Sequence, residues 1–386
     1  MAEPPDDPFG GLPFLGDLAR AMSGQGPISW EAAQQFAQLG ATGGTTEANV
    51  DPASRIAIDR LAGIARMHLT DLTGIDLDES APSVVTPGRW AADTLEAYRP
   101  LFTDLATALS RHAEADEGAG DPMAQMMAGL SRMMAPAMLG MAVGSMVGDL
   151  ARRAFGVHDL PIPRQSPTLS LVPSTIDAFA NEWEIGADEM RMWVLAHEYA
   201  GWIVGSAPGL SSTLSGLIRR HVGAFRPDPD AIAERLGSLD MSGDDPMEAL
   251  QRTLGDPEVL LGAIRSPEQR ELAPALDAVV AAVVGLTDWL VDAVSVRVVG
   301  GEALRIAEAV RRRRVESSSA DVFVERLLGV RIDDAQVREG KAFVQGVVDR
   351  IGEDRAISTL LTHHDAAPTA SEITAPGLWL ARLGIE

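Results

Sequence analysis

One segment of this chain is apolar on almost every side, and it restricts the possible folds more than any other feature. Residues 272–301 read LAPALDAVVAAVVGLTDWLVDAVSVRVVGG. A helix that is hydrophobic all round is a helix that the rest of the protein surrounds. We therefore expect this segment to form a helix at the centre of the core, with other helices packed around it.

Most of the remaining chain also has helical periodicity. Ser29 is a suitable N-cap for a helix that Gly40 could end, and residues 51–74 and 86–113 carry apolar residues at helical spacing. Strand signals are few, and the main one is the alternation from Leu169 to Val172. The sequence predicts a mainly α fold, a multi-helix domain with little β structure.

The chain shows no internal repeat of fixed period, and we expect one continuous helical domain over residues 29–386. The preceding residues 1–28 are rich in proline and predict an irregular segment without the features of a secretory signal. An acidic, glycine-rich stretch near residues 113–121 predicts a mobile loop inside the domain.

A second apolar run, MMAPAMLGMAVGSMVG at residues 133–148, needs a separate interpretation. It is shorter than the ~20 residues that a membrane-spanning helix requires. Gly140, Gly144 and Gly148 repeat every four residues and would form a flat stripe on one helical face. We expect this stripe to let two helices approach closely, and we predict a cytoplasmic protein without membrane association.

Charge and cysteine content exclude several functions. The net charge of −23 disfavours nucleic acid as a partner, because phosphate binding requires a basic surface. The chain has no cysteine, which excludes disulfides, thiolate metal sites and a cysteine nucleophile.

The stretch HEYAG at residues 197–201 resembles the zinc-binding motif H-E-x-x-H up to its last letter. On a helix, histidines at positions i and i+4 share one face and can bind one Zn²⁺, while the glutamate activates the metal-bound water. Here Gly201 replaces the second histidine and supplies no ligand. By itself a His-Glu pair in a helix is weak evidence for a metal site.

Long motifs elsewhere in the chain strengthen the interpretation. They include PFGGLPFLGDLARAM, MLGMAVGSMVGDLARRAFGVHDLPIPR, SLVPSTIDAFANEWEIGADEMRMWVLAHE and RRRRVESSSADVFVERLLGVRIDDAQVREGKAFVQGVV. In this order and over almost the whole length, the chain resembles the zincin-like metallopeptidase type 2 family of actinobacterial proteins. That family is labelled as candidate hydrolases or zinc-dependent metalloproteases.

The resemblance implies roles for individual residues. His197 matches the first zinc ligand and Glu198 matches the catalytic general base. The second zinc histidine falls on Gly201. A third, acidic ligand from a downstream helix falls on Val284, so two of three metal ligands are lost.

Other residues could rebuild a metal site, and His221 and Asp288 are the candidates that we consider. Nothing in their spacing demands such a site, and His221, beside Arg219 and Arg220, also reads as a surface residue. His158 has no acidic or histidine partner at ligand spacing. The space left beside Gly201 could be filled by aromatic side chains, for which Tyr199, Trp202 and Trp289 are large enough.

The run RRRR at residues 311–314 ends a predicted helix. Cations at a helix C-terminus are favourable, so we interpret the run as a solvated helix end, with binding of an acidic partner as the alternative.

These observations lead to two functional hypotheses. In the first, the chain is a catalytically inactive zincin-like protein, a pseudoenzyme that acts as an interaction or scaffold module for a protein or peptide and needs no cofactor. In the second, it is an active zinc-dependent metallopeptidase or hydrolase with a rearranged site. The sequence leaves enzymatic activity open.

Overall fold

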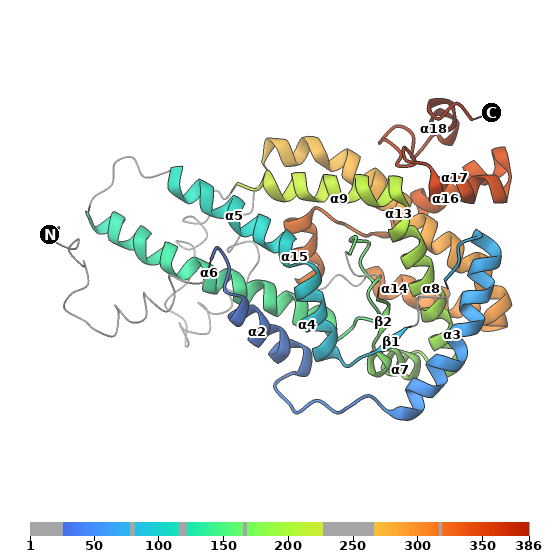
Figure 1. Cartoon of the computed structure of the whole chain (residues 1–386), viewed down its shortest axis with the longest axis horizontal. Helices are drawn as coiled ribbons and strands as arrows, with labels where there is room; N and C mark the ends of the chain where they lie inside the picture. The colour runs from blue at the N-terminus through green and yellow to red at the C-terminus, as the bar shows by residue number, and fades with distance from the viewer. Residues whose placement is uncertain are drawn as a thin grey trace.

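The protein is described by a computed structural model that covers residues 26–77, 82–115, 122–164, 168–226, 266–315 and 319–385. Over these ranges the fold is mainly α, as the sequence predicts (Figure 1). Most of the predicted irregular segment 1–28 and residues 116–121 of the predicted mobile loop lie outside the described ranges.

The helices follow in chain order. The first set is α2 (Trp30–Thr42), α3 (Pro52–Thr73), α4 (Pro87–Ala97), α5 (Arg99–Ala115), α6 (Pro122–Ala151), α7 (Pro173–Glu182), α8 (Ala187–Ser206) and α9 (Pro208–Gly223). The second set is α13 (Pro267–Val298), the short 3-10 helix η1 (Gly300–Glu302), α14 (Ala303–Val315), α15 (Ser319–Leu328), α16 (Asp334–Ile351), α17 (Glu353–Thr362) and α18 (Pro376–Arg382).

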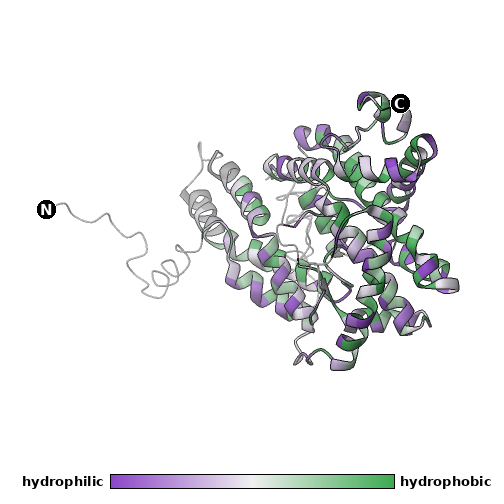
Figure 2. Cartoon of the chain, turned by 45° about the vertical axis from the view of Figure 1, so that its right-hand side comes forward, coloured by the Kyte–Doolittle hydropathy of each residue, from purple (hydrophilic) through white to green (hydrophobic). Residues whose placement is uncertain are grey.

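The central helix is α13, and its position confirms the interpretation of the apolar segment. It begins with a capping box in which Ser266 and Gln269 bond each other's backbone N–H groups. It then packs against α16, α8, α9 and α3. Hydrophobic residues concentrate where the helices face one another, and hydrophilic residues lie on the outer turns (Figure 2). The buried residues of all these helices form one continuous hydrophobic core.

Two helix boundaries differ from the prediction. The first helix passes Gly40 and ends at Thr42, where Gly43 caps it with a left-handed backbone (φ 60°). Residues 86–113 form two helices instead of one, with the break at Tyr98. Pro100 accounts for this break, because proline lacks an N–H donor and is tolerated only in the first turn of the second helix.

The apolar run of α6 packs against α2, and its glycines make the contact, as the sequence predicts. A Cβ atom on Gly140 or Gly144 would collide with the backbone of α2 at Ser29 and Ala33. A Cβ atom on Gly148 would lie 2.8 Å from the Cα of Gly40. The two helices therefore touch backbone to backbone.

The same device joins α13 to α16. A Cβ atom on Gly285 would lie 2.5 Å from the Cα of Gly340, and one on Gly340 would lie 3.0 Å from the Cα of Gly285. By length and composition, α13 and Met133–Ala151 of α6 could each cross a membrane. Within the protein, 72% of the apolar window of α13 is buried, which accounts for its composition without a bilayer.

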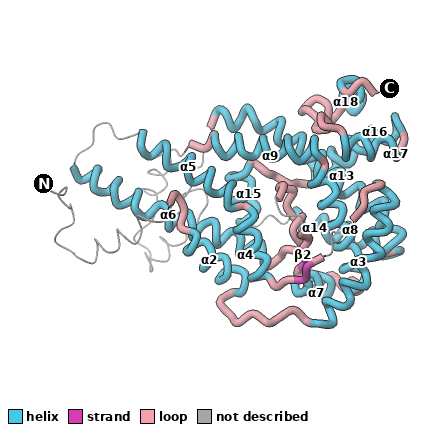
Figure 3. The backbone as a smooth tube through the Cα atoms, in the orientation of Figure 1, coloured by secondary structure: helices cyan, strands magenta, loops and turns pink. Residues whose placement is uncertain are grey.

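A small parallel sheet lies between the helices and positions one loop. Strand β1 (Ser83–Val84) pairs with β2 (Ser170–Leu171), in line with the strand signal around Leu169 (Figure 3). Leu171 also forms an antiparallel bridge to Gly156. This bridge fixes the segment 154–159, which lies directly against helix α8.

Candidate active site

His197 and Glu198 lie in the middle of α8, and both are buried. Helix α8 packs against α3, α7 and α13. His197 therefore lies on a buried helix that packs against the central apolar helix. Nδ1 of His197 lies 3.6 Å from Oε1 of Glu198, and each residue also has partners of its own.

The Glu198 carboxylate is held by the loop 154–159. The backbone N–H of Val157 donates to Oε2 at 2.9 Å, and the backbone N–H of His158 reaches Oε2 at 3.1 Å and Oε1 at 3.2 Å. The ring nitrogen Nδ1 of His158 lies 3.0 Å from Oε2. A buried carboxylate is costly unless it is paired, and this one has both backbone donors and a ring partner.

Opposing effects act on the pKa of Glu198. Burial raises it, because the charged form loses its hydration. The interactions with His158 and His197 act in the other direction, and together they lower the pKa of Glu198 to about 2. The side chain is therefore an ionised acceptor of hydrogen bonds at neutral pH.

The loop that holds Glu198 is itself anchored from three sides. The indole N–H of Trp90 in α4 donates to the carbonyl of Gly156 at 2.8 Å. The N–H of Val172 donates to the carbonyl of Phe155 at 2.9 Å, and the Thr175 hydroxyl bonds the carbonyl of Ala154. A Cβ atom on Gly156 would collide with the Glu198 carboxylate, so glycine is needed for this close approach.

His158 occupies the space beside Gly201. A Cβ atom on Gly201 would lie 2.5 Å from Cβ and 2.6 Å from Cγ of His158. Ligand spacing in the sequence offered no acidic partner for His158, and the fold brings it to Glu198, 40 residues away. Apart from its chain neighbours, the side chain nearest to Gly201 is this imidazole and not one of the three aromatic residues that are large enough to fill the space.

Those three aromatic residues have other contacts. Tyr199 is fully buried, and its pKa is raised to about 12 by burial, with Arg66 and Asp59 of α3 as its charged neighbours. The indole of Trp289 donates to Gln345 on α16 at 3.0 Å. Trp202 lines the cavity described below.

The ring nitrogen Nε2 of His197 faces an arginine. Nη2 of Arg314, from α14, lies 3.4 Å from Nε2 of His197. The same guanidinium holds the carboxylate of Asp288 on α13 through two bonds of 2.6 and 3.0 Å. Burial raises the pKa of Asp288, but the charge and hydrogen bonds of Arg314 outweigh it and lower the pKa. The ring of Trp193 stacks on His197 with centroids 5.3 Å apart.

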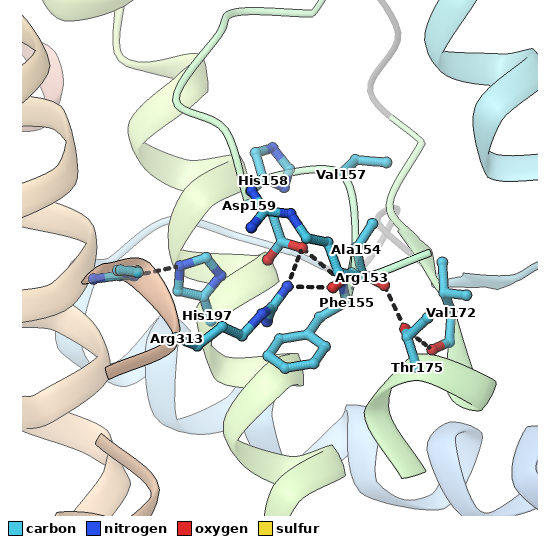
Figure 4. Close-up of polar contacts among 12 residues, drawn as sticks. Arg153, Ala154, Phe155, Val157, His158, Asp159, Val172, Thr175, His197 and Arg313 are labelled. Carbon is cyan, nitrogen blue, oxygen red and sulfur yellow. Dashed lines mark hydrogen bonds and ion pairs between the residues drawn. The ribbon is translucent and has the colours of Figure 1, made fainter. Parts of the chain in front are cut away.

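Arg313 and Asp159 form a second charged pair beside His197 (Figure 4). Their charged groups lie 3.6 Å apart, and Arg313 also bonds the carbonyl of Arg153. Its guanidinium lies 3.6 Å above the ring of Phe155. Asp159 in turn accepts a hydrogen bond from the N–H of Phe155 at 2.6 Å.

The arginine run 311–314 is thus only partly a solvated helix end. Arg311 and Arg312 are exposed and pair with Glu308. Arg313 and Arg314 turn inward to the site instead. Four consecutive residues pass about 300° around a helix, so a helix packed on one side cannot leave all four in solvent.

His221 and Asp288, the two substitute ligands considered from the sequence, lie apart. Asp288 lines the same cavity as His197, whereas His221 lines a different one. His221 was also expected at the surface, and the structure contradicts this, because only 2% of it is exposed. The side chain of Gln269 bonds its backbone carbonyl at 3.1 Å and approaches its ring nitrogen at 3.4 Å.

The positions matched to zinc ligands do not fit a zinc ion. Gly201 has no donor atom and is covered by His158, and Val284 contributes only methyl groups to the cavity wall. The Nε2 atom of His197 faces the guanidinium of Arg314, and its Nδ1 atom lies 3.6 Å from Oε1 of Glu198. A catalytic zinc ion takes three protein ligands and a water, and these positions provide one protein ligand.

Another set of possible donors is present among the described residues. One ligand atom each from Asp159, His197 and Glu198 can be chosen so that all three lie within 4.8 Å of one another. Both arginines of the site lie beside this group, at 3.6 Å from Asp159 and 3.4 Å from His197. The sequence did not predict Asp159 as a member of the site.

Two cavities open on either side of this cluster. The first has a volume of about 300 Å³ and lies between the loop 158–164 and helices α8, α9 and α13. The second, of about 210 Å³, reaches toward α4 and α15. His197, Asp159, Arg164 and Arg314 line both, so the charged cluster forms a wall between them.

Signals for the missed residues existed in the sequence. The motif AFGVHDLPIPR contains Gly156, His158 and Asp159 as well as Arg164, and its second half contains two prolines, which favour a loop. Polar residues in such a loop are functional candidates, because binding and catalytic residues often lie on loops that a rigid scaffold positions. Spacing alone could not pair them with α8, since the contacts join residues about 40 positions apart.

Comparison with known proteins agrees with this fold. A crystal structure of a candidate hydrolase with a novel fold, from Chloroflexus aurantiacus, is similar to this chain with a TM-score of 0.57 and 21% sequence identity. The match covers 93% of this chain and 99% of the other, and at this identity it shows a shared fold. No curated protein matches the sequence. A family model described as zincin-like metallopeptidase matches residues 28–380. The chain therefore belongs to the zincin-like metallopeptidase family.

Proposed function

We propose that this chain is a non-catalytic member of the zincin-like family that acts as a binding module. The observation that carries the proposal is the guanidinium of Arg314 between Nε2 of His197 and the carboxylate of Asp288. The positive charge of Arg314 therefore lies beside Nε2 of His197, a ring nitrogen through which this histidine could bind zinc.

A guanidinium differs from a metal ion in what it can do at this position. It satisfies an imidazole lone pair and a carboxylate, so the buried acceptors keep a cationic partner. It has no open coordination position, and it cannot lower the pKa of a bound water as zinc does. In this arrangement the site keeps a positive charge but has no metal-bound water to act as the nucleophile.

The contacts of Glu198 support the same conclusion. A general base must reach a water molecule within hydrogen-bond distance of the substrate. Both oxygens of Glu198 instead accept hydrogen bonds from Val157 and His158. In this role Glu198 joins α8 to the loop 154–159, which is a structural function.

An active zinc-dependent hydrolase with a rearranged site is the second candidate function. The grouping of Asp159, His197 and Glu198 favours it, because carboxylate and imidazole are suitable zinc ligands. Arg313 and Arg314 oppose it, because their positive charges would repel a divalent cation at the same place. We therefore place this function second.

The metal content of the purified protein distinguishes the two functions. We expect far less than one zinc per chain after dialysis against zinc buffer, and no chelator-sensitive hydrolysis of peptides. About one zinc per chain, removed together with activity by a chelator and lost in Asp159→Ala, would reject the proposal in favour of the rearranged site.

A repair experiment tests the role of the two obstructing side chains. The variant His158→Gly, Gly201→His, Val284→Glu, Arg314→Ala clears the space and supplies two ligands. We expect it to bind about one zinc per chain, provided that circular dichroism shows a folded protein. A matched variant with Gly201→Ala in place of Gly201→His lacks one ligand and should bind far less.

The partial repair Gly201→His, Val284→Glu leaves His158 and Arg314 in place. We expect weak zinc binding, because the new histidine collides with His158 and Arg314 keeps its charge at His197. Equal zinc content in the partial and full repair would show that neither side chain obstructs the metal.

A further inference from the structure

The first cavity has the composition of a ligand site. Its inner wall is apolar and comes from three helices, with Leu214 on α9, Val204 on α8, and Val283 and Val284 on α13. Ile332 closes the same side. A volume of about 300 Å³ is at the lower end of the range for small-molecule sites.

The charges around the cavity are almost all paired within the protein. Nδ1 of His158 lies 3.0 Å from Glu198, and the Asp288 carboxylate bonds Arg314 at 2.6 Å. The carboxylate of Asp159 lies 3.6 Å from Arg313. Among the described residues that line this cavity, Arg164 is the cation without an acidic partner.

Arg164 is nevertheless held in a defined position. Its Nε donates to the hydroxyl of Tyr98 at 3.1 Å, and Nη2 donates to the hydroxyl of Thr94 at 3.1 Å. The guanidinium lies 4.9 Å from the ring centroid of Tyr98 and 5.7 Å from that of Trp90. The Tyr98 hydroxyl in turn donates to the carbonyl of Ile162, which ties the arginine to its own loop.

This arrangement leaves part of the guanidinium for a ligand. Both hydrogen bonds of Arg164 go to neutral hydroxyls, so its charge is not compensated. Its Nη1 makes no hydrogen bond to the described residues. An arginine fixed in advance loses little rotamer freedom when it binds a carboxylate, and planar carboxylates match its geometry.

We propose that the cavity binds an apolar monocarboxylate, with the carboxylate on Arg164 and the apolar part against Val283, Val284 and Ile332. This inference rests on the proposed function, because a binding module needs a ligand that it holds without turnover. The shared chemistry fits a free apolar acid or the C-terminal carboxylate of a peptide, and the test separates these two sources.

Octanoate serves as the probe for a free acid, and its affinity can be measured by isothermal titration calorimetry at pH 7.5. We expect octanoate to bind at least about tenfold more tightly than octanamide or octylammonium, since only the carboxylate can pair with Arg164. Equal affinity of octanoate and octanamide would overturn the proposal.

N-acetyl-leucyl-phenylalanine and its C-terminal amide test the peptide source under the same conditions. Tighter binding of the free-acid peptide than of octanoate assigns the site to peptide C-termini. The reverse order assigns it to small acids. Both orders support the carboxylate site, provided that the amide of each probe binds worse.

The variant Arg164→Gln should weaken octanoate binding about tenfold or more, and Arg164→Lys should keep part of it. Arg219→Gln removes the same charge from an exposed position of α9 and should leave the affinity unchanged. If Arg164→Gln proves unfolded by circular dichroism, the Lys variant and the acid-to-amide ratio decide the matter. An unchanged affinity in folded Arg164→Gln would overturn the proposal.

The octanoate experiment and the metal experiment can fail separately. A zinc-containing protein that binds octanoate through Arg164 would reject the proposed function and keep this inference. A zinc-free protein that binds octanoate and octanamide equally would reject this inference alone.

Discussion

The two halves of the arginine run on α14 consist of the same residue type, but one half is exposed and the other is largely buried. Arg311 and Arg312 have side chains that are 47% and 59% exposed, and both pair with Glu308 one turn earlier. Arg313 and Arg314 are 20% and 23% exposed and bind the charged groups around His197. The residue type alone therefore says little about the role of a charged side chain; the face of the helix on which it lies must also be known.

The energetic meaning of the pairs differs accordingly. An exposed ion pair gains little, because water and salt screen the attraction and two long side chains lose freedom. A largely buried pair costs desolvation when it forms, but removing one partner leaves the other charge unpaired. We expect the second half of the run to be sensitive to substitution and the first half to tolerate it.

The largest expected effect is that of Arg314→Ala. It leaves Asp288 without its guanidinium, and we expect a loss of unfolding free energy on the order of 3 kcal/mol, at the low end of the range for buried pairs. Urea denaturation measures it. The double variant Arg314→Met, Asp288→Leu should recover much of the loss, because it removes both charges.

Arg311→Ala is the matched control for this experiment, since it removes the same side chain from the exposed half. A loss of stability as large as that of Arg314→Ala would contradict the difference that we draw between the two halves.

An intermediate effect is expected from Gly201→Ala, which tests the contact with His158. The added Cβ would lie 2.5 Å from Cβ of His158. Overpacking of this kind costs about 1–3 kcal/mol, partly offset by the helix propensity of alanine. The loss should be smaller in the background of His158→Gly, where the opposing Cβ is absent.

Gly205→Ala on the same helix is the control for that substitution. Outside its own helix, no atom of the described residues lies within 4 Å of a Cβ placed there, so alanine should be neutral or stabilising by up to about 1 kcal/mol. Thermal unfolding of the two variants side by side checks the contrast, and a similar decrease in both would refute the steric role of His158.

The smallest effect concerns the exposed pairs. Hydrogen bonds from Arg311 and Arg312 lower the pKa of Glu308 to about 2. A lowered pKa in the folded state gives stability that is present above the usual pKa, ~4.5, and lost as the pH falls toward 2. Because 44% of the Glu308 side chain is exposed and water screens its ion pairs, the stability difference between the wild type and Glu308→Gln should be small.

Acid titrations of unfolding at low and high ionic strength measure this difference. It should disappear at high salt, where exposed charges are screened. A large difference that persists at high salt would show that the exposed half of the run stabilises the fold as the buried half does.

The fold could be predicted well from the sequence, because its signals are local. The all-apolar segment of α13 and the N-cap of α2 depend on residues within a few turns. Even the role of the α6 glycines followed from their spacing. Gly40 was misread as a stop, because a glycine that ends a helix and one that touches another helix look the same in a sequence.

The site could be predicted only along α8. His197 and Glu198 are neighbours in a recognisable motif, whereas their partners come from distant segments. Val157 and His158 lie about 40 residues before Glu198, and Arg314 lies about 117 residues after His197. Such contacts depend on how the helices pack, and neither helical period nor ligand spacing encodes that packing.

The glycine contacts between helices have a consequence for how this sequence can diverge. Gly40 faces Gly148, and Gly285 faces Gly340, each across a backbone-to-backbone contact. A larger residue at either position would separate the helices. Replacing one glycine of a pair therefore does not make a larger residue tolerable at the other. We therefore expect both glycines of each pair to be kept among homologues, while neighbouring core positions exchange one apolar residue for another. In an alignment, these four glycines would identify the fold even in proteins where His197 and Glu198 are replaced.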